Sequence, residues 1–292
     1  MKPTYSVCVC NYNMAETLEV SLKSVLDQLD ERYEVVVVDD GSKDSSVEIL
    51  ENLSTLYENL RYIPLARDYR RKLGDTRNLS IEAARGKYVI LHIDADDKWE
   101  PYIDSFIRVF HELSKRLDFE NFVLSGSQIH MAPRDLLLKN KYPNVYYTED
   151  RILCHNLAAK GAFISIKHKL FRTRIPIKTR KKKLIKVIKS QFSSMLVSFS
   201  YNPYPAKSFF EYMARIFRKS DWSFIVSSIN LMLIFPAFIY GVFFNRAERI
   251  DTLDRSFREL SPIDINRIEK KYIEKYGKFK LSKDERIIYY LE

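Results

Sequence analysis

Mainly apolar runs alternate with amphipathic stretches along the first third of the chain. The runs occupy residues 5–12, 33–40, 60–66 and 88–93, which predicts strands buried on both faces. Between the runs, apolar residues recur every three or four positions, as in Leu18, Leu22, Val25, Leu26 and Leu29 or in Val47, Leu50, Leu53 and Leu56. Such spacing predicts helices, and strands interleaved with helices predict an α/β fold: a mostly parallel, doubly wound sheet with helices on both faces.

The pattern weakens after Trp99, but it still predicts further elements. Helices are expected at 101–117 and 149–161, a strand at 122–131 and a last pair of strands within 163–175. Gly86 and Gly161 follow predicted helices and are expected to end them, since glycine is common just past a helix end.

Carboxylates gather at the ends of two predicted strands. Asp39 and Asp40 close the second strand, and Asp94, Asp96 and Asp97 close the fourth. Ligands of parallel α/β sheets bind at the carboxyl ends of the strands. Because crowded carboxylates repel one another, a positive group is expected between them. The alternative is that Asp97 caps the following helix and that the other acids are solvated.

The glycines exclude two familiar nucleotide sites. The seven glycines nowhere form G-x-G or G-x-x-x-x-G-K, which argues against an NAD domain and a P-loop NTPase. A diphosphate can still be held by a divalent cation that carboxylates bind, and Mg²⁺ and Mn²⁺ both prefer oxygen ligands. Asp94 and Asp96, separated by the small Ala95, can project toward a common ion.

Three stretches that contain acidic residues follow one another along the chain in a distinctive order. They are "VVVVDDGSKDSS", "LGDTRNLSIEAARGKYVILHIDADD" and "TEDRILCHNLAAKGAF". In this order, residues 5–174 resemble the GT-A glycosyltransferases, in particular the inverting enzymes of family 2, with Thr76 and Ser80 replacing the usual Ala and Gly. The resemblance implies a GT-A catalytic domain over residues 1–178 that transfers a sugar from a GDP- or UDP-sugar. The Q-x-x-R-W motif of processive synthases is absent, which favours single-sugar transfer.

The resemblance also implies roles for individual residues. Asp39 would bind the donor's base, Asn11 would contact the nucleotide, Asp40 would lie near the ribose or diphosphate, and Asp94 would contact the ribose. Asp96, with Asp94, would form a DXD-type site for Mg²⁺ or Mn²⁺. Asp150 would be the general base, and the possible diphosphate contacts are Arg77, Lys72, Arg172 and Arg174. The alternatives are a solvated helix face for Lys72 and a helix N-terminal acidic pair for Glu149 and Asp150.

Residues 179–292 are expected to form a helical region with three parts: a polybasic amphipathic helix, an apolar segment and a charged helical tail. The apolar segment, residues 223–244, has no charge over 22 residues and would rise about 33 Å as a helix, enough to cross a bilayer. Basic residues flank it on both sides, so a broken hairpin dipping in near Pro236 fits better than one complete span. A buried core helix is the alternative. We expect an enzyme attached to the cytoplasmic face of the cell membrane, with a glycolipid or polyprenyl phosphate as acceptor.

The charge distribution and the cysteine content exclude further classes of function. Residues 167–189 hold eleven Lys or Arg and no acid, and without them the formal net charge of +10 would be −1. Such a cluster could bind nucleic acid, but it adjoins an apolar segment, so no nucleic-acid partner is expected. Three cysteines without metal-ligand spacing argue against structural zinc and fit a reducing compartment. A metal-dependent nucleotidyltransferase is the enzymatic alternative.

Overall fold

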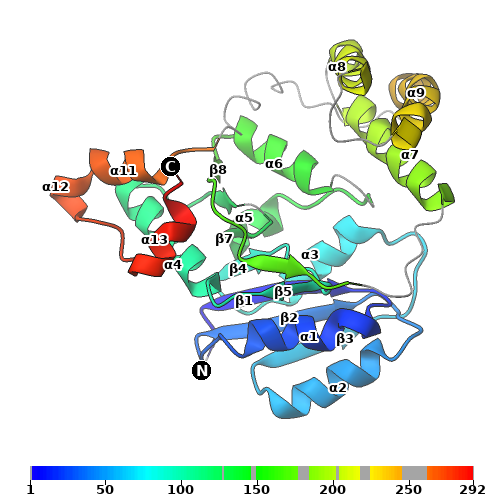
Figure 1. Cartoon of the computed structure of the whole chain (residues 1–292). Helices are drawn as coiled ribbons and strands as arrows, with labels where there is room; N and C mark the ends of the chain where they lie inside the picture. Colours follow the sequence, from blue (N-terminus) through cyan, green and yellow to red (C-terminus); the bar gives the residue numbers. More distant parts are fainter. Residues whose placement is uncertain are drawn as a thin grey trace.

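The computed structural model describes residues 2–126, 128–145, 149–176, 184–201, 204–217, 224–244 and 262–291. Residues 2–176 form an α/β domain around a seven-stranded sheet (Figure 1). The strand order is β3-β2-β1-β4-β7-β6-β8, and pairing is parallel except at β7. The strands are β1 (Tyr5–Asn11), β2 (Tyr33–Asp39), β3 (Leu60–Pro64), β4 (Tyr88–Leu91), β6 (Val123–Ser125), β7 (His130–Pro133) and β8 (Phe163–Ser165).

Helices cover both faces of this sheet, as the interleaved pattern predicts. One apolar cluster joins the sheet to α1 (Ala15–Leu26), α2 (Ser46–Leu56) and α4 (Ile103–Leu117). A second cluster joins the opposite face to α3 (Leu73–Ala83), α5 (Arg134–Lys139) and α6 (Glu149–Ala159). Successive strand residues alternate between the two clusters, so Val7 and Val9 lie in the first and Cys8 in the second.

Two strand predictions are wrong in their pairing. The 122–131 strand is instead the antiparallel pair β6 and β7. The expected last pair within 163–175 does not pair with itself, because β8 joins β6 in the main sheet. The other member, β9 (Arg172–Arg174), pairs with β5 (Asp97–Trp99) in a separate two-stranded sheet. This small sheet places two arginines beside the acids that follow β4.

The helix-end prediction at Gly86 is also wrong. α3 ends at Ala83, and Gly86 lies against the edge of β1. A Cβ atom at position 86 would lie 2.8 Å from both the Ser6 Oγ and the Tyr5 carbonyl carbon. Gly86 therefore permits a close approach of two backbones, whereas Gly161, with a φ of +68°, follows α6 as expected. Leu56, expected on the buried stripe of α2, is 69% exposed.

Three helices after the α/β domain pack on one another (Figure 1). α7 (Leu184–Tyr201), α8 (Pro205–Phe217) and α9 (Phe224–Ile239) share a small core that includes Met195, Phe199, Ile234 and Ala237. α9 continues through Pro236 into the π-helical turn η1 (Tyr240–Phe244), so the expected broken hairpin is wrong. Among the described residues, Val226–Phe243 is the one stretch long and apolar enough to cross a membrane.

The last part of the chain returns to the α/β domain. α11 (Ile265–Lys271), α12 (Ile273–Tyr276) and α13 (Lys283–Tyr289) lie beside α4, and Ile265, Phe279 and Tyr289 join its apolar cluster (Figure 1). Residues 262–291 therefore share a core with the sheet. Residues 177–183 of the polybasic run and 245–261 of the charged tail lie outside the described residues. The division of the chain at residue 178 stays a prediction.

Candidate active site

A cavity of about 370 Å³ opens at the carboxyl ends of the central strands. It is lined by residues from β1, from the segments after β2, β3 and β4, and from α3, among them Asn11, Asp40, Arg67, Thr76, Asp94 and Asp96. The register of β1 and β2 pairs Asn11 with Asp39, so polar residues that end both strands reach the same edge. This is where a parallel sheet offers a binding site.

The acids after β4 form a tight cluster, as the sequence predicts. One carboxylate oxygen from each of Asp94, Asp96 and Asp97 lies within 4.8 Å of the other two. Helix α1 fixes the backbone of this turn: the Ser21 hydroxyl donates to the Asp94 carbonyl at 3.0 Å, and the Thr17 hydroxyl donates to the Ala95 carbonyl at 2.8 Å. The three side chains therefore converge on a turn in which α1 holds two successive backbone carbonyls.

Two arginines of β9 supply positive charge to this acidic cluster. The Arg172 guanidinium donates to Asp97 Oδ1 at 2.5 Å, and Arg174 pairs with Asp96 and reaches Asp97 at 3.3 Å. Burial raises the pKa of Asp97, which Arg174 and Arg172 oppose, and burial likewise raises the pKa of Asp94. The expected diphosphate contacts Arg172 and Arg174 thus lie beside the acids.

The donor set of the acidic cluster fits a hard divalent cation. All three side chains offer oxygen, the ligand type that Mg²⁺ and Mn²⁺ prefer. Asp97 Oδ2 is buried and has no hydrogen-bond partner among the described residues, which leaves an unsatisfied acceptor in the cluster. Asp94 and Asp96 both line the cavity, so a cation held by them would face any ligand in it.

The acids after β2 divide between two environments. Asp39 is fully buried, and its carboxylate accepts from the Asn11 amide at 2.6 Å and from the Ser42 backbone at 2.9 Å. Asp40 lines the cavity and pairs with Arg67 and Arg71, the latter at 2.5 Å. The Arg67 guanidinium also lies 4.4 Å from the centre of the Tyr12 ring.

Arg67 and Arg71 are site residues that the sequence reasoning missed. Both follow β3 in the stretch "ARDYRRK", where basic residues after a third strand were the available signal. Lys72, in the same stretch, caps the start of α3 and is not among the residues that line the cavity. Its backbone amide donates to the Asn144 side chain at 2.9 Å, so the structure gives Lys72 a structural contact.

Arg77 links the acidic cluster to the start of α6. Its guanidinium is buried and lies 3.1 Å from the Glu149 carboxylate and 4.0 Å from that of Asp94. Asp150 follows Glu149 in the first turn of α6, and its carboxylate accepts from the Arg151 backbone at 2.7 Å. Asp150 is not among the residues that line the cavity.

Two histidines, His92 and His130, lie close enough to Arg77 to feel its charge. The rings of His92 and His130 have centroids 4.2 Å apart, and His92 adopts a left-handed φ of 64° where β4 ends. Burial lowers the pKa of both imidazoles, that of His130 to about 4 despite the opposing charge of Asp150. Both rings are therefore neutral at physiological pH.

Solved structures share this architecture. Over 94% of this chain and 88% of the other, Staphylococcus aureus TarS 1–349 in complex with UDP-GlcNAc is similar at a TM-score of 0.56 and 17% identity. The mannosyltransferase PcManGT from Pyrobaculum calidifontis, in complex with GDP-Man and Mn²⁺, is similar at a TM-score of 0.53 and 16% identity, over 98% and 83% of the two chains. The α/β domain therefore has the GT-A fold of nucleotide-sugar transferases, as expected.

Sequence comparisons agree. Residues 6–131, somewhat less than half of the chain, match the family model described as glycosyl transferase family 2. TuaG of Bacillus subtilis, named as a teichuronic acid biosynthesis glycosyltransferase, is 32% identical over 118 residues, or 40% of this chain. The cholesterol galactosyltransferase of Borreliella burgdorferi is 30% identical over 138 residues, or 47% of this chain. These matches span 42% and 36% of the two relatives' own length.

Proposed function

We propose that the protein transfers one sugar from a UDP- or GDP-sugar to a lipid-linked acceptor, with inversion and in a reaction that depends on Mg²⁺ or Mn²⁺. The observation that carries the proposal is the cluster of Asp94, Asp96 and Asp97, of which Asp94 and Asp96 line a cavity at the sheet's carboxyl edge. Of the two proteins with a similar fold, TarS binds UDP-GlcNAc, and PcManGT binds GDP-Man together with Mn²⁺.

Residues around the cavity can divide the work of holding the donor. Asp39 and Asn11 would contact the nucleotide, and their mutual hydrogen bond fixes the two side chains for that contact. Asp40, held by Arg67 and Arg71, would lie near the ribose or diphosphate. Arg77, Arg172, Arg174 and Lys72 are the candidate cations for the diphosphate, and the first three already lie beside the acidic cluster.

The transfer itself needs a leaving group and a proton acceptor. Asp94 and Asp96 would hold the cation, which when bound neutralises charge on the departing nucleoside diphosphate. The acceptor oxygen forms a bond to the anomeric carbon as the bond from that carbon to the diphosphate breaks. Asp150 would take the proton of an acceptor hydroxyl. An acceptor phosphate is already ionised and does not need this step.

A lipid-linked acceptor and the cytoplasmic face of the membrane are proposed from two observations. One relative is named for transfer to cholesterol, a lipid. The stretch Val226–Phe243 is long and apolar enough to enter a bilayer, and little of it is buried within the protein. Nucleotide-sugars are made in the cytosol, so the donor site is expected on that side.

A thermal-shift panel tests the proposal. UDP-, GDP- and CDP-sugars are added with Mn²⁺, and one of them should raise the melting temperature of the wild type but not of Asp96→Ala. Glu48→Ala, which removes an exposed carboxylate on α2, is the matched control and should respond like the wild type. If no nucleotide-sugar stabilises the wild type, or if Asp96→Ala responds equally, the donor site is wrong. Release of pyrophosphate in place of UDP or GDP would indicate nucleotidyl transfer.

A further inference from the structure

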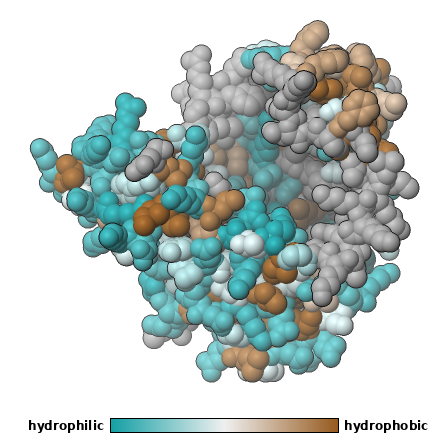
Figure 2. All heavy atoms as spheres, viewed as in Figure 1, coloured by the Kyte–Doolittle hydropathy of each residue, from teal (hydrophilic) through white to brown (hydrophobic). Residues whose placement is uncertain are grey.

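Helices α8 and α9 and the turn η1 carry large apolar side chains that stay exposed in the described part of the chain. α9 buries Ile234 and Ala237 in the core that it shares with α7, whereas Met232, Phe235 and Ile239 of α9 and Phe243 of η1 are exposed at helical spacing. Met232 is 77% exposed and Phe235 is 54% exposed, and on α8 both Phe210 and Phe217 are 70% exposed. We call these six outward residues the apolar face; Figure 2 shows apolar residues gathered over α8 and α9.

The chain enters and leaves this helical part from the same α/β domain. Before α7, the Ile175 amide donates to the Asp96 carbonyl at 2.8 Å, which ties the end of β9 to the acidic cluster. After η1, the Ile263 amide donates to the Ser165 carbonyl at 2.7 Å, and Ile263 forms a parallel bridge with Ile166 beside β8. Ile175 and Ile263, which come before and after the helical part in the chain, are therefore both fixed to the α/β domain.

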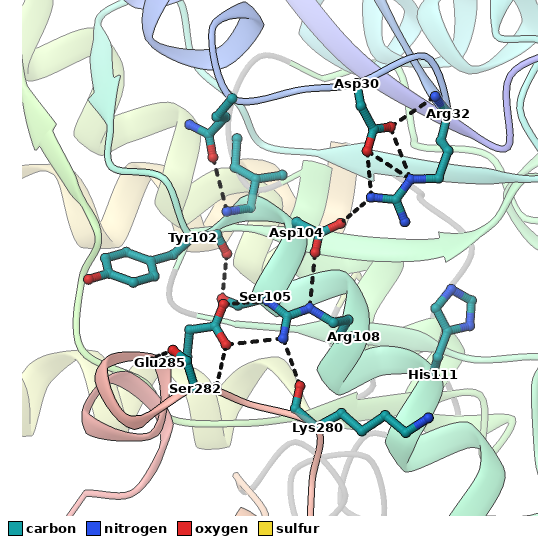
Figure 3. Close-up of polar contacts among 12 residues, drawn as sticks. Asp30, Arg32, Tyr102, Asp104, Ser105, Arg108, His111, Lys280, Ser282 and Glu285 are labelled. Atoms are coloured by element: carbon teal, nitrogen blue, oxygen red, sulfur yellow. Dashed lines mark hydrogen bonds and ion pairs between the residues drawn. The ribbon is translucent and has the colours of Figure 1, made fainter.

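Side chains then fasten the segment 262–291 to α4. Arg108 of α4 donates to the Lys280 carbonyl at 2.7 Å and pairs with Glu285 of α13 (Figure 3). The hydroxyls of Ser105 and Tyr289 lie 2.9 Å apart in a buried contact. Asp104, next to Ser105, pairs with Arg108 and with Arg32, so the contacts continue into the α/β domain (Figure 3).

These contacts distinguish a helix that crosses the bilayer completely from one that is bound to the bilayer from one side. A single complete crossing by α9 and η1 would place the segments before and after it on opposite sides of the bilayer. Among the described residues no second stretch is long and apolar enough to bring the chain back. Residues 245–261 cannot supply that crossing either, because eight of these 17 residues are charged. A crossing is incompatible with 262–291 packed on α4.

We propose that the apolar face lies within one leaflet of an anionic lipid bilayer, with both ends of the helical part on the same side as the α/β domain. The charge of the sequence selects the partner: residues 167–189 hold eleven Lys or Arg, and Arg218, Lys219, Arg246 and Arg249 flank α9 and η1. Such basic residues favour anionic headgroups. The mode of attachment deepens the membrane association in the proposed function and does not depend on sugar transfer.

Vesicle binding tests the partner. The full chain, without donor or acceptor, is sedimented with phosphatidylcholine vesicles that contain either no or about one third phosphatidylglycerol. The wild type should sediment with the anionic vesicles, and the double variant Met232→Asp/Phe235→Asp should bind at least about tenfold more weakly, since two charges enter the apolar face. Leu56→Asp, an equally exposed apolar residue on α2, is the matched control and should bind like the wild type.

Two results of this experiment would overturn the proposal. One is a wild type that stays in the supernatant with anionic vesicles. The other is a dimer in sedimentation velocity that the double variant disperses, because the apolar face would then be an interface between two copies. Circular dichroism melting checks that the double variant is folded, and Phe210→Asp, on α8, repeats the test if it is not.

Cysteine labelling in bacterial cells tests whether the α/β domain and residues 262–291 lie on the same side of the membrane. Lys43→Cys in the α/β domain and Lys278→Cys in the last segment, each exposed, are made in a Cys10→Ser background and treated with a membrane-impermeant maleimide. Both positions should react in inverted membrane vesicles and neither in spheroplasts. Reaction of the two positions in different preparations would show a complete crossing and overturn the proposal. Because no activity is measured, a failed transfer assay leaves this result standing.

Discussion

The guanidinium of Arg174 pairs with the carboxylate of Asp96, the residue proposed to hold the metal. Arg174 lies on β9 and Asp96 just before β5, so the small two-stranded sheet brings a positive side chain onto the acidic cluster. A cation bound there must share Asp96 with Arg174 or displace it. A metal bound at Asp96 and the guanidinium of Arg174 would therefore compete for the same carboxylate.

Replacing Arg174 with alanine should strengthen Mn²⁺ binding in the absence of donor. The Arg174 side chain is about half exposed, and exposed ion pairs contribute about 0.2–1 kcal/mol, so the gain should reach about fivefold at most. The gain in Mn²⁺ affinity is measured by titration, with electron paramagnetic resonance reporting the free Mn²⁺. Thr173→Ala, the neighbour on β9, is the control; equal Mn²⁺ affinity in Arg174→Ala and wild type would contradict the competition.

Replacing Asp96 with alanine should remove metal-dependent transfer. Lewis-acid stabilisation of a leaving diphosphate is a matter of several kcal/mol, so the rate should fall by about 10²-fold or more. Release of UDP or GDP from the donor, with and without added Mn²⁺, gives the readout. A variant that still responds to Mn²⁺ like the wild type would exclude Asp96 as a ligand.

Replacing Asp150 with asparagine should separate the two classes of acceptor. General base catalysis contributes about 10²–10⁴-fold, and only a hydroxyl acceptor needs it. Transfer to a glycolipid hydroxyl should therefore be nearly abolished, while transfer to a polyprenyl phosphate should be largely spared. The neighbouring Arg151→Gln tests whether any change in this turn of α6 has the same effect. If both variants lose both activities equally, Asp150 does not act as the base.

The protein should lose stability as the pH falls below about 6.5. Burial is the first cause that lowers the pKa of all five histidines, to about 4 for His130 and His155. The unfolded chain then binds more protons than the folded one between pH 6.5 and 4, so the free energy of unfolding decreases as protons are added. Melting temperatures over this range give the slope, and His130→Gln should flatten it. An unchanged slope in that variant would show that His130 takes up no extra proton on unfolding.

Substituting Gly86 with alanine should destabilise the α/β domain by about 1–3 kcal/mol, the usual cost of overpacking. The new Cβ atom would lie 2.8 Å from the Tyr5 carbonyl carbon and 2.9 Å from the Ser6 amide nitrogen, and backbone cannot easily move. Urea unfolding measures the loss. At Gly161 a Cβ has no neighbour within 4 Å, so Gly161→Ala should cost only about 1–2 kcal/mol, through its positive φ. A Gly86→Ala protein as stable as the wild type would contradict the close approach.

The acidic cluster could be predicted because its acids directly follow apolar runs that have the pattern of parallel strands. Asp39 and Asp40, like Asp94, Asp96 and Asp97, end apolar runs, and parallel strands bring such ends to one edge. Arg67 and Arg71 could not be placed in the same way. They lie in an irregular segment after β3, and only the tertiary fold brings them onto Asp40.

The pairing of β9 with β5 was hidden for a different reason. Both strands are three residues long and largely charged, so neither carries the apolar period that identifies a buried strand. Residues 262–291 were misjudged in another way, because they look solvated in the sequence but are partly buried in the structure. Their short helices have the periodicity of a solvated tail, yet Phe279 and Tyr289 complete the core around α4. Neither contact has a local signal, because each joins residues far apart in the chain.

Because residues 262–291 pack on α4, the core of the α/β domain cannot be completed until this segment has been synthesised. The ribosome makes the apolar helix α9 before it makes the residues that complete the core of the α/β domain. A nascent chain therefore exposes α9 to solvent while the α/β domain is unfinished, and exposed apolar surface promotes aggregation during that time. Early capture of α9 by lipid or by a chaperone would protect the chain until residues 262–291 emerge.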